Sequence, residues 1–370
     1  MKDDELLYLL ALTRLPGLGI IGAHQLLRCV PNATYLFQNR NNLKKEIPSL
    51  SPRLLQALDC PDILRQCEAE LNFADKNKIA CLTANDTAYP SRLRECDDAP
   101  LILFYKGNAD LNGLHVVNLV GTRNATNYGK EICERFIKDL KKLLPDTLIV
   151  SGLAYGIDIA AHRASLLQGL PTVGVLAHGL DRIYPAVHRK TAAEMIEQGG
   201  LLTEFMSGTT PERQNFIKRN RIVAGMCDAT IVVESAEKGG ALITADIAES
   251  YNRECFAFPG RISDPYSAGC NHLIQNNRAS LLLDAEGLVK AMNWNAVPVK
   301  PAAIQRQLFV DLSPEEETIV QQLQQHPDGL QINTLIVVTN IPINRMTSLL
   351  FELEMKGIIR AYAGGMYKLI

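Results

Sequence analysis

Short apolar runs alternate with amphipathic segments through the middle of this 370-residue chain. Seven runs are almost wholly apolar, as expected of strands that are buried on both faces of a sheet. They cover residues 116–120, 148–150, 172–176, 201–203, 230–233, 255–258 and 280–283. Between most of them apolar residues recur at helical spacing, for example over residues 130–142 and 241–252. This alternation predicts an α/β domain at residues 85–295, with a parallel Rossmann-like sheet and helices on both faces.

The amino-terminal segment, residues 1–80, has helical patterns only. Between its first two patterns lies Leu-Pro-Gly-Leu-Gly-Ile, residues 15–20, which resembles the turn of a helix-hairpin-helix motif. In that motif the glycines, here Gly17 and Gly19, let backbone N–H groups approach a DNA phosphate, but glycines also serve as plain helix punctuation. A weaker copy of this turn follows at residues 47–51, and two such turns predict a small helix-hairpin-helix or SAM-like domain. Because the second copy lacks the glycines, we expect it to serve in packing only.

The carboxyl-terminal segment has the pattern of a winged helix. Residues 296–310 contain prolines and no strong period, which is typical of a linker. The segment 311–370 then shows a helix capped at Ser313, helices at 333–338 and from Pro342, and strands at 358–362 and 366–370. Its four basic and seven acidic residues give a net charge of −3. Phosphate binding needs the opposite balance, so a partner-docking or accessory role is favoured.

Composition bounds the class of protein. The net charge of −2 does not indicate a nucleic-acid binder, so any such site must be a local basic patch. The nine cysteines form no Cys-x-x-Cys pair, which favours a reducing compartment over a zinc site or a disulfide framework. The chain starts with an acidic segment and has no long apolar stretch. We therefore expect a cytoplasmic protein without membrane spans.

Ligands of parallel sheets bind beyond the carboxyl ends of the strands, so the residues that follow each strand are candidates. The stretch 148–163 combines a strand, a turn with Ser151, Gly152 and Gly156, and a helix whose amino end would favour phosphate. Asp158 in its first turn already satisfies the helix dipole, and simple strand-to-helix packing is the alternative. Arg123 follows the first strand, and Gly240 opens a later helix. The chain has neither a Gly-x-Gly-x-x-Gly fingerprint nor a Walker A loop.

A cationic run is the most specific local feature. It consists of Phe216, Lys218, Arg219, Asn220 and Arg221, with Arg213 just before it. Each cation would neutralise one phosphate, and the aromatic ring would stack on a base. The alternative is a solvated helix face, although the run leads directly into apolar helix residues.

No catalytic or metal-binding set is evident. Asp158 and His162 are spaced to share a helix face, but no nucleophile or metal trio accompanies them, so a structural role is favoured over acid–base chemistry. We therefore predict neither an enzyme nor a cofactor.

Many motifs occur in order between residues 89 and 283, and together they resemble the DprA/Smf family of bacterial DNA-processing proteins. They include VGTR (120–123), SGLAYGID (151–158), GLDRIYP (179–185), FIKRNRIVAG (216–225), VVES (232–235), GGALITA (239–245) and FAFPG (256–260). The resemblance implies an extended Rossmann-like fold that binds single-stranded DNA without catalysis, protects incoming DNA and loads the RecA recombinase in natural transformation. It also implies a homodimer joined through the late part of this domain.

The same resemblance assigns roles to residues. Arg123 and Lys218 match the family's main DNA-contacting charges. The supporting positions and the phosphate-side loop are Arg219, Asn220 and Arg221, and Ser151, Gly152 and Gly156.

Two other functions remain as alternatives. Residues 238–246 can be aligned with the Pro-Gly-Gly-x-Gly-Thr-x-x-Glu motif of nucleoside-monophosphate phosphoribohydrolases, but four functional positions differ, including Lys238 for proline and Asp246 for glutamate. The second alternative is a transcription regulator with a DNA-reading winged helix, which the acidic carboxyl-terminal segment disfavours.

Overall fold

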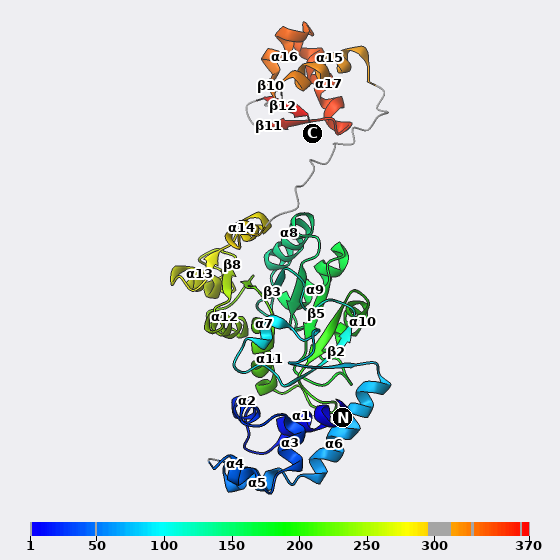
Figure 1. The fold of residues 1–370 in the computed structure, drawn as a ribbon. Coiled ribbons are helices and arrows are strands. Elements are labelled where there is room, and N and C mark those ends of the chain that lie inside the picture. Colours follow the sequence, from blue (N-terminus) through cyan, green and yellow to red (C-terminus); the bar gives the residue numbers. More distant parts are fainter. Residues whose placement is uncertain (1, 49, 295–311, 327–328, 363–364, 370) are drawn as a thin grey trace. The chain divides into compact units, whose positions relative to one another are not determined.

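The computed structural model describes residues 2–48, 50–294, 312–326, 329–362 and 365–369. The chain divides into two compact units, residues 1–299 and 300–370 (Figure 1). The segments 1–80 and 85–295, predicted as separate domains, both belong to the first unit. The predicted linker 296–310 lies outside the described residues.

The amino-terminal segment forms six helices among the residues described. They are α1 (Lys2–Arg14), α2 (Ile20–Arg28), α3 (Ala33–Gln38), α4 (Leu43–Glu46), α5 (Pro52–Ala57) and α6 (Pro61–Lys76). Gly17 has φ +82° in the turn between α1 and α2, a conformation that glycine adopts without strain. The core of this segment includes Leu10 and Leu36 and continues into Phe104 of the sheet.

Nine strands form one sheet within the described residues, in the order β1-β2-β6-β5-β4-β3-β7-β8-β9. They are β1 (Ala80–Thr83), β2 (Ile102–Gly107), β3 (Val116–Val120), β4 (Leu148–Ser151), β5 (Thr172–Val175), β6 (Gly199–Thr203), β7 (Ala229–Val232), β8 (Glu254–Ala257) and β9 (Ser280–Leu281). All seven predicted strands are present, and β3 to β9 pair in parallel. Strands β1 and β2 were not predicted, and they extend the β6 edge in antiparallel pairing.

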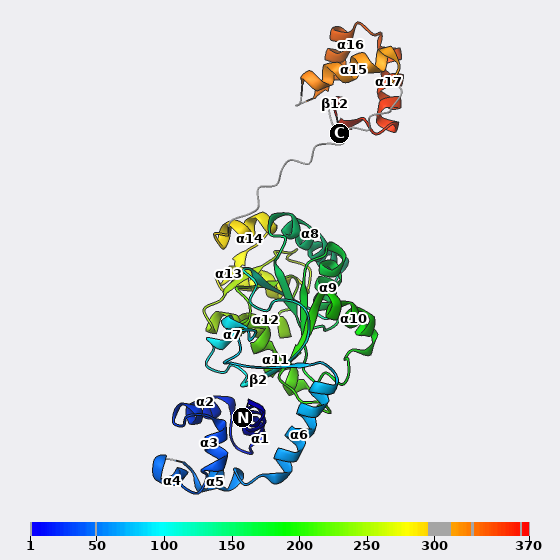
Figure 2. The ribbon, with the colours of Figure 1, turned by 45° about the vertical axis from the view of Figure 1, so that its right-hand side comes forward.

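Helices cover both faces of the sheet, as predicted (Figure 2). Those around the sheet are α7 (Ser91–Arg94), α8 (Asn127–Leu143), α9 (Ile157–Gln168), a 3₁₀ turn (Ala186–His188), α10 (Arg189–Gln198), α11 (Arg213–Gly225), α12 (Gly240–Ser250), α13 (Ala268–Gln275) and α14 (Ala285–Ala291). One core joins the sheet to α11, α12 and α13. The other joins the opposite face to α8, α9 and α14.

The second unit is a winged helix. It contains α15 (Pro314–Gln325), β10 (Leu330–Gln331), α16 (Ile332–Thr339), α17 (Ile343–Met355), β11 (Ile359–Tyr362) and β12 (Met366–Leu369). Ser313 and Glu316 form the predicted capping box of α15, and β11 and β12 form the predicted hairpin. The short strand β10, which pairs with β12, was not predicted.

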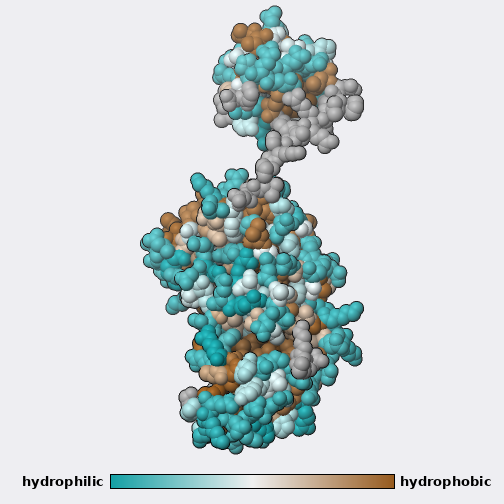
Figure 3. Space-filling view, in the orientation of Figure 1, coloured by the Kyte–Doolittle hydropathy of each residue, from teal (hydrophilic) through white to brown (hydrophobic). Residues whose placement is uncertain are grey.

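Hydrophobic residues lie exposed on this unit, among them Ile343, Phe351 and Met355 of α17 (Figure 3). Along the described chain, no single helix has the length and apolar character needed to cross a membrane. The bent pair α16 and α17 passes the same test by length and composition only.

Candidate functional site

A large pocket lies where the strand order of the sheet reverses. After β3 the chain builds outward through β4, β5 and β6, and it then returns to place β7 on the other side of β3. Ligands of open α/β sheets bind in the crevice at such a switch point. The pocket has a volume of about 970 Å³ and is lined by the loops after β3, β4 and β7 and by α11 and α12. We call it the switch-point pocket.

Arg123 and part of the cationic run on α11 both line this pocket. The exposed Arg123 lies on the β3–α8 loop, and its Cζ atom is 5.3 Å from the ring centre of Phe216 on α11. The ring of Tyr184 lies on another side of Phe216, with the ring centres 6.0 Å apart. Asn220 and Gly240, two further predicted residues, also line the pocket. Arg123, Phe216, Asn220 and Gly240 therefore lie around one pocket.

Arg219 forms part of the pocket floor and is 4% exposed. Its Nη1 donates a hydrogen bond to the Val175 carbonyl oxygen. A Cβ atom at Gly152 would lie 2.0 Å from Nη1, so the guanidinium packs directly on the glycine backbone. Burial lowers the pKa of Arg219, and the charge of Asp158 partly opposes this shift. Burial likewise raises the pKa of Asp158, against the influence of Arg219 and of hydrogen bonds from the Gly152 and Ala154 amides.

Two other predicted cations lie outside the pocket lining. Arg221 lies outside the pocket lining, where Nη2 binds the Glu204 carboxylate and Nη1 donates to the Asp98 carbonyl oxygen at 2.6 Å. Lys218 is exposed and also lies outside the lining. Two of the cations predicted to contact DNA, Arg219 and Arg221, are thus held within the protein by other groups.

The glycine-rich turn after β4 packs against the loop that carries Arg123. Ser151 is buried and donates from Oγ to the Leu119 carbonyl oxygen at 2.6 Å. Gly156 has φ +81°, and a Cβ there would lie 2.1 Å from the Thr122 carbonyl oxygen. The turn therefore packs against the loop that carries Arg123, and glycine is required at this contact.

Lys238 was not among the residues predicted for the site. Lys238 lines the pocket just before the amino end of α12, where Gly239 supplies no side-chain cap. Its place before Gly239-Gly240 at a helix start is a signal that the sequence contains. The charged residues of the lining are Arg123, Arg213, Arg219 and Lys238, and Asp158 and Asp246. Four cations against two carboxylates give a local charge of +2, in a chain of net charge −2.

Asp158 and His162 have separate partners. His162 is fully buried, and its Nδ1 lies 2.7 Å from Thr172 Oγ1, whereas Asp158 accepts from backbone amides. Burial, together with the nearby charges of Arg219 and His188, lowers the pKa of His162 to about 3. Asp158 and His162 are therefore bonded to different groups. Within the described residues, no three His, Cys, Asp or Glu side chains are grouped to hold a metal ion.

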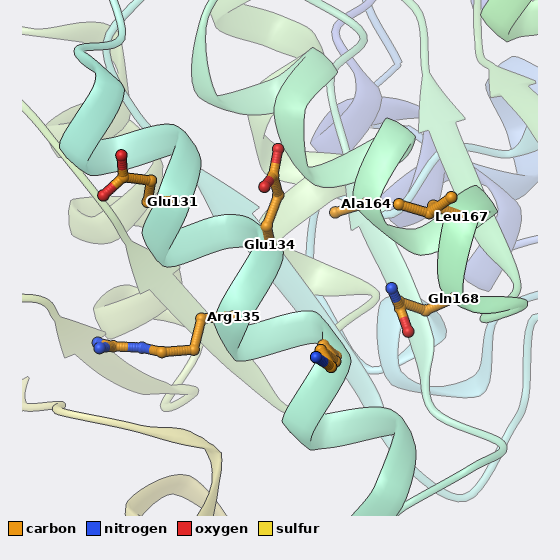
Figure 4. A pocket seen from close by; sticks show the side chains of 7 residues that line it. Glu131, Glu134, Arg135, Ala164, Leu167 and Gln168 are labelled. Carbon is orange, nitrogen blue, oxygen red and sulfur yellow. The ribbon is translucent and has the colours of Figure 1, made fainter. Parts of the chain in front are cut away.

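A second, smaller pocket of about 320 Å³ lies between α8 and α9 (Figure 4). Its charged residues are Glu131, Glu134, Arg135 and Lys138, so its cations and carboxylates balance. Leu167 adds an apolar side chain that is 79% exposed. The balanced charge distinguishes this pocket from the switch-point pocket.

Family models and known proteins match the chain. The family model for DNA recombination-mediator protein A matches residues 80–293, and the model for the DprA winged helix domain matches residues 302–365. The chain is 43% identical over 198 residues to the DNA processing protein DprA of Streptococcus pneumoniae, covering 54% of this chain and 69% of that protein. It is 32% identical over 313 residues to the protein Smf of Escherichia coli, covering 82% and 81%.

Two solved structures are similar. The X-ray structure of DprA from Streptococcus pneumoniae has a TM-score of 0.57 at 31% identity and covers 73% of this chain and 97% of that one. A structure of DprA from Helicobacter pylori has a TM-score of 0.51 at 26% identity and covers 57% and 98%. A single-stranded DNA binding mode is described for that Helicobacter pylori protein.

Proposed function

The chain belongs to the DprA/Smf family of DNA-processing proteins, and on this premise we propose that it binds single-stranded DNA in the switch-point pocket without catalysing a reaction. The observation that carries the proposal is the local charge of +2 in the pocket lining of a chain whose net charge is −2. The described binding mode of the Helicobacter pylori relative gives independent support.

The pocket suits a flexible strand. Its volume of about 970 Å³ is at the upper end of the range for small-molecule sites, so it has room for more than one nucleotide. The exposed cations Arg123, Arg213 and Lys238 are placed to contact phosphates, and Phe216 offers an aromatic face. Lys218 adds a cation on the exposed side of α11.

Family membership supports a proposal about the wider role. We propose that the protein protects incoming DNA, hands it to the RecA recombinase during natural transformation, and acts as a homodimer joined through the late part of the sheet domain. The winged helix, which carries exposed apolar residues on α17, is proposed to dock a protein partner instead of reading duplex DNA.

Binding is expected to be strongly salt-dependent. If the three exposed pocket cations each contact one phosphate, log Kobs for single-stranded DNA falls with log salt concentration with a slope of roughly −2. Duplex DNA is expected to bind more weakly, because stacking on Phe216 requires unpaired bases. Fluorescence anisotropy of labelled oligothymidine and of a duplex of equal length, over a range of salt concentrations, measures both. An affinity that does not change with salt, or a preference for duplex, contradicts the proposal.

The Phe216 ring is expected to contribute without changing the salt dependence. Phe216→Leu keeps an apolar side chain but removes the aromatic face on which a base would stack, a contact worth about 1 kcal/mol or more. We expect oligothymidine affinity to fall about fivefold or more. The salt slope stays at its wild-type value because no charge is removed. Phe216→Tyr is the matched control and should bind like the wild type. Equal losses in both variants would contradict a role for the ring.

A further inference from the structure

Glu234 accepts hydrogen bonds from the loop that carries Arg123, on both sides of that residue. It lies just beyond the end of β7 and is 1% exposed. Its carboxylate accepts hydrogen bonds from the Thr126 backbone N–H at 2.9 Å and from the Thr126 hydroxyl. Its own carbonyl oxygen accepts from the Thr122 N–H at 2.7 Å. Arg123 therefore lies between two backbone positions that are both bonded to one residue.

The chain around Arg123 also packs against Glu234 at close range. A Cβ atom at Gly129 would lie 2.2 Å from Glu234 Oε2, and one at Gly121 would lie 2.8 Å from the Glu234 carbonyl oxygen. Thr126 caps α8 by accepting from the Gly129 N–H, so the carboxylate contacts the start of that helix as well. Gly129 thus makes room for the Glu234 carboxylate, and Gly121 makes room for the Glu234 backbone.

Ser235, the residue after Glu234, is hydrogen-bonded to another part of the pocket lining. The Ser235 N–H donates to the Tyr266 carbonyl oxygen at 2.7 Å, and the Ser235 carbonyl oxygen accepts from the Gly269 N–H at 2.8 Å. Tyr266 and Ser235 both line the switch-point pocket, whereas Glu234 does not. The end of β7 therefore joins the Arg123 loop on one side to the Tyr266 loop on the other.

We propose that Glu234 is a positioning residue for DNA binding, which holds the 121–129 loop so that the Arg123 guanidinium stays beside Phe216. A buried carboxylate is costly unless donors satisfy it, and here Thr126 supplies two donors from the loop that carries Arg123. Fixing a binding cation before the ligand arrives reduces the ordering cost of association. The inference rests on the proposed function, since it concerns the same pocket.

The test is a double-mutant cycle on Glu234→Gln and Arg123→Ala, with oligothymidine affinity measured across salt concentrations. The amide oxygen of glutamine can accept one of the two hydrogen bonds that Thr126 donates, but the NH2 group replaces the second acceptor, so the loop loses one of its two side-chain bonds while the side-chain volume is kept. We expect Glu234→Gln to weaken binding roughly tenfold and to reduce the magnitude of the salt slope by about 0.7, as Arg123→Ala does. The double variant should bind no more weakly than Arg123→Ala alone.

The controls separate positioning from general damage. Thr126→Ser keeps both donors to the carboxylate and should bind like the wild type, whereas Thr126→Val loses the hydroxyl and should reduce affinity and salt slope in the same direction as Glu234→Gln. If Glu234→Gln does not fold, Thr126→Val carries the test.

Additive losses in the double variant, or a salt slope unchanged by Glu234→Gln and by Thr126→Val, would overturn the inference while leaving DNA binding intact. A wild-type protein that does not bind oligothymidine would instead overturn the proposed function.

Discussion

Replacing Arg123 by alanine is expected to weaken binding of single-stranded DNA tenfold or more. Arg123 is an exposed cation of the pocket lining, and its guanidinium lies 5.3 Å from the Phe216 ring centre. A hydrogen bond to a charged group contributes about 1.5–3 kcal/mol, which corresponds to roughly tenfold to a hundredfold in affinity. The magnitude of the salt slope should fall by about 0.7, since one phosphate contact is lost. Oligothymidine titrations at several salt concentrations measure both quantities.

Two arginine controls define what this result means. Arg163→Ala removes an exposed cation of α9 outside the pocket lining and should leave affinity and salt slope unchanged. Arg221→Ala removes a guanidinium that binds Glu204, so it should lower the free energy of unfolding with little effect on the salt slope. If Arg163→Ala and Arg123→Ala reduce the slope equally, the binding cations are spread over the surface and the pocket is not their site.

The strands of the parallel sheet could be predicted because both of their faces are buried. All five residues of β3 are buried, and four of them are apolar, so the run stands out from the helical segments. Strand β2 carries the same signal, since Ile102 to Tyr105 are all buried, but it was not assigned. Its antiparallel pairing with β6, for example Phe104 with Thr203, could not be predicted, because no local pattern contains a contact between residues so far apart.

The place of the candidate pocket was predictable, but the position of every cation around it was not. The switch point follows from the order of strands, and Arg123 follows β3 directly. On α11, Arg219 shares a face with the buried residues Ile222 and Val223, three and four positions later, so helical periodicity already indicates that it points inward. The internal position of Arg221 depends on Glu204, which lies beyond β6 and has no recognisable spacing to it.

Glu234 was missed because its partners are distant in sequence. It stands in the VVES motif, two positions after β7, and its carboxylate bonds to Thr126 at the start of α8. A polar residue at the end of a buried strand is the one signal that the sequence gives. Whether such a residue faces a ligand or supports a loop is decided by the neighbouring strand, here β3, and only the pairing of β3 with β7 brings the two segments together.

The stability of the protein is expected to fall steeply in mild acid because of His162. Burial lowers its pKa to about 3, from an ordinary value of 6.5. The Thr172 hydroxyl donates to the Ile149 carbonyl oxygen, so it receives the N–H of His162 Nδ1, and the buried Nε2 is left as an acceptor that has no partner within the described part of the chain. A proton on Nε2 would create a charge that is buried near Arg219.

The direction in which stability changes with pH depends on whether the folded or the unfolded state binds the proton. Between pH 6.5 and 3 the unfolded chain protonates this histidine while the folded protein does not, so the contribution present above pH 6.5 is lost as the pH falls. From pH 7 to 5 the loss amounts to about 2 kcal/mol of unfolding free energy. Asp158 acts in the opposite direction, because burial raises its pKa and the folded state then takes up a proton first.

A variant that does not titrate separates the two groups. His162→Gln should be less stable than the wild type at pH 7, but its unfolding free energy, from urea denaturation, should change between pH 7 and 5 by about 2 kcal/mol less than that of the wild type. His272→Gln removes an exposed histidine and should keep the wild-type pH dependence. If His162→Gln and the wild type lose stability in parallel over this range, the acid sensitivity comes from other groups. The packed layer beneath the glycine-rich turn would then tolerate a charged imidazole.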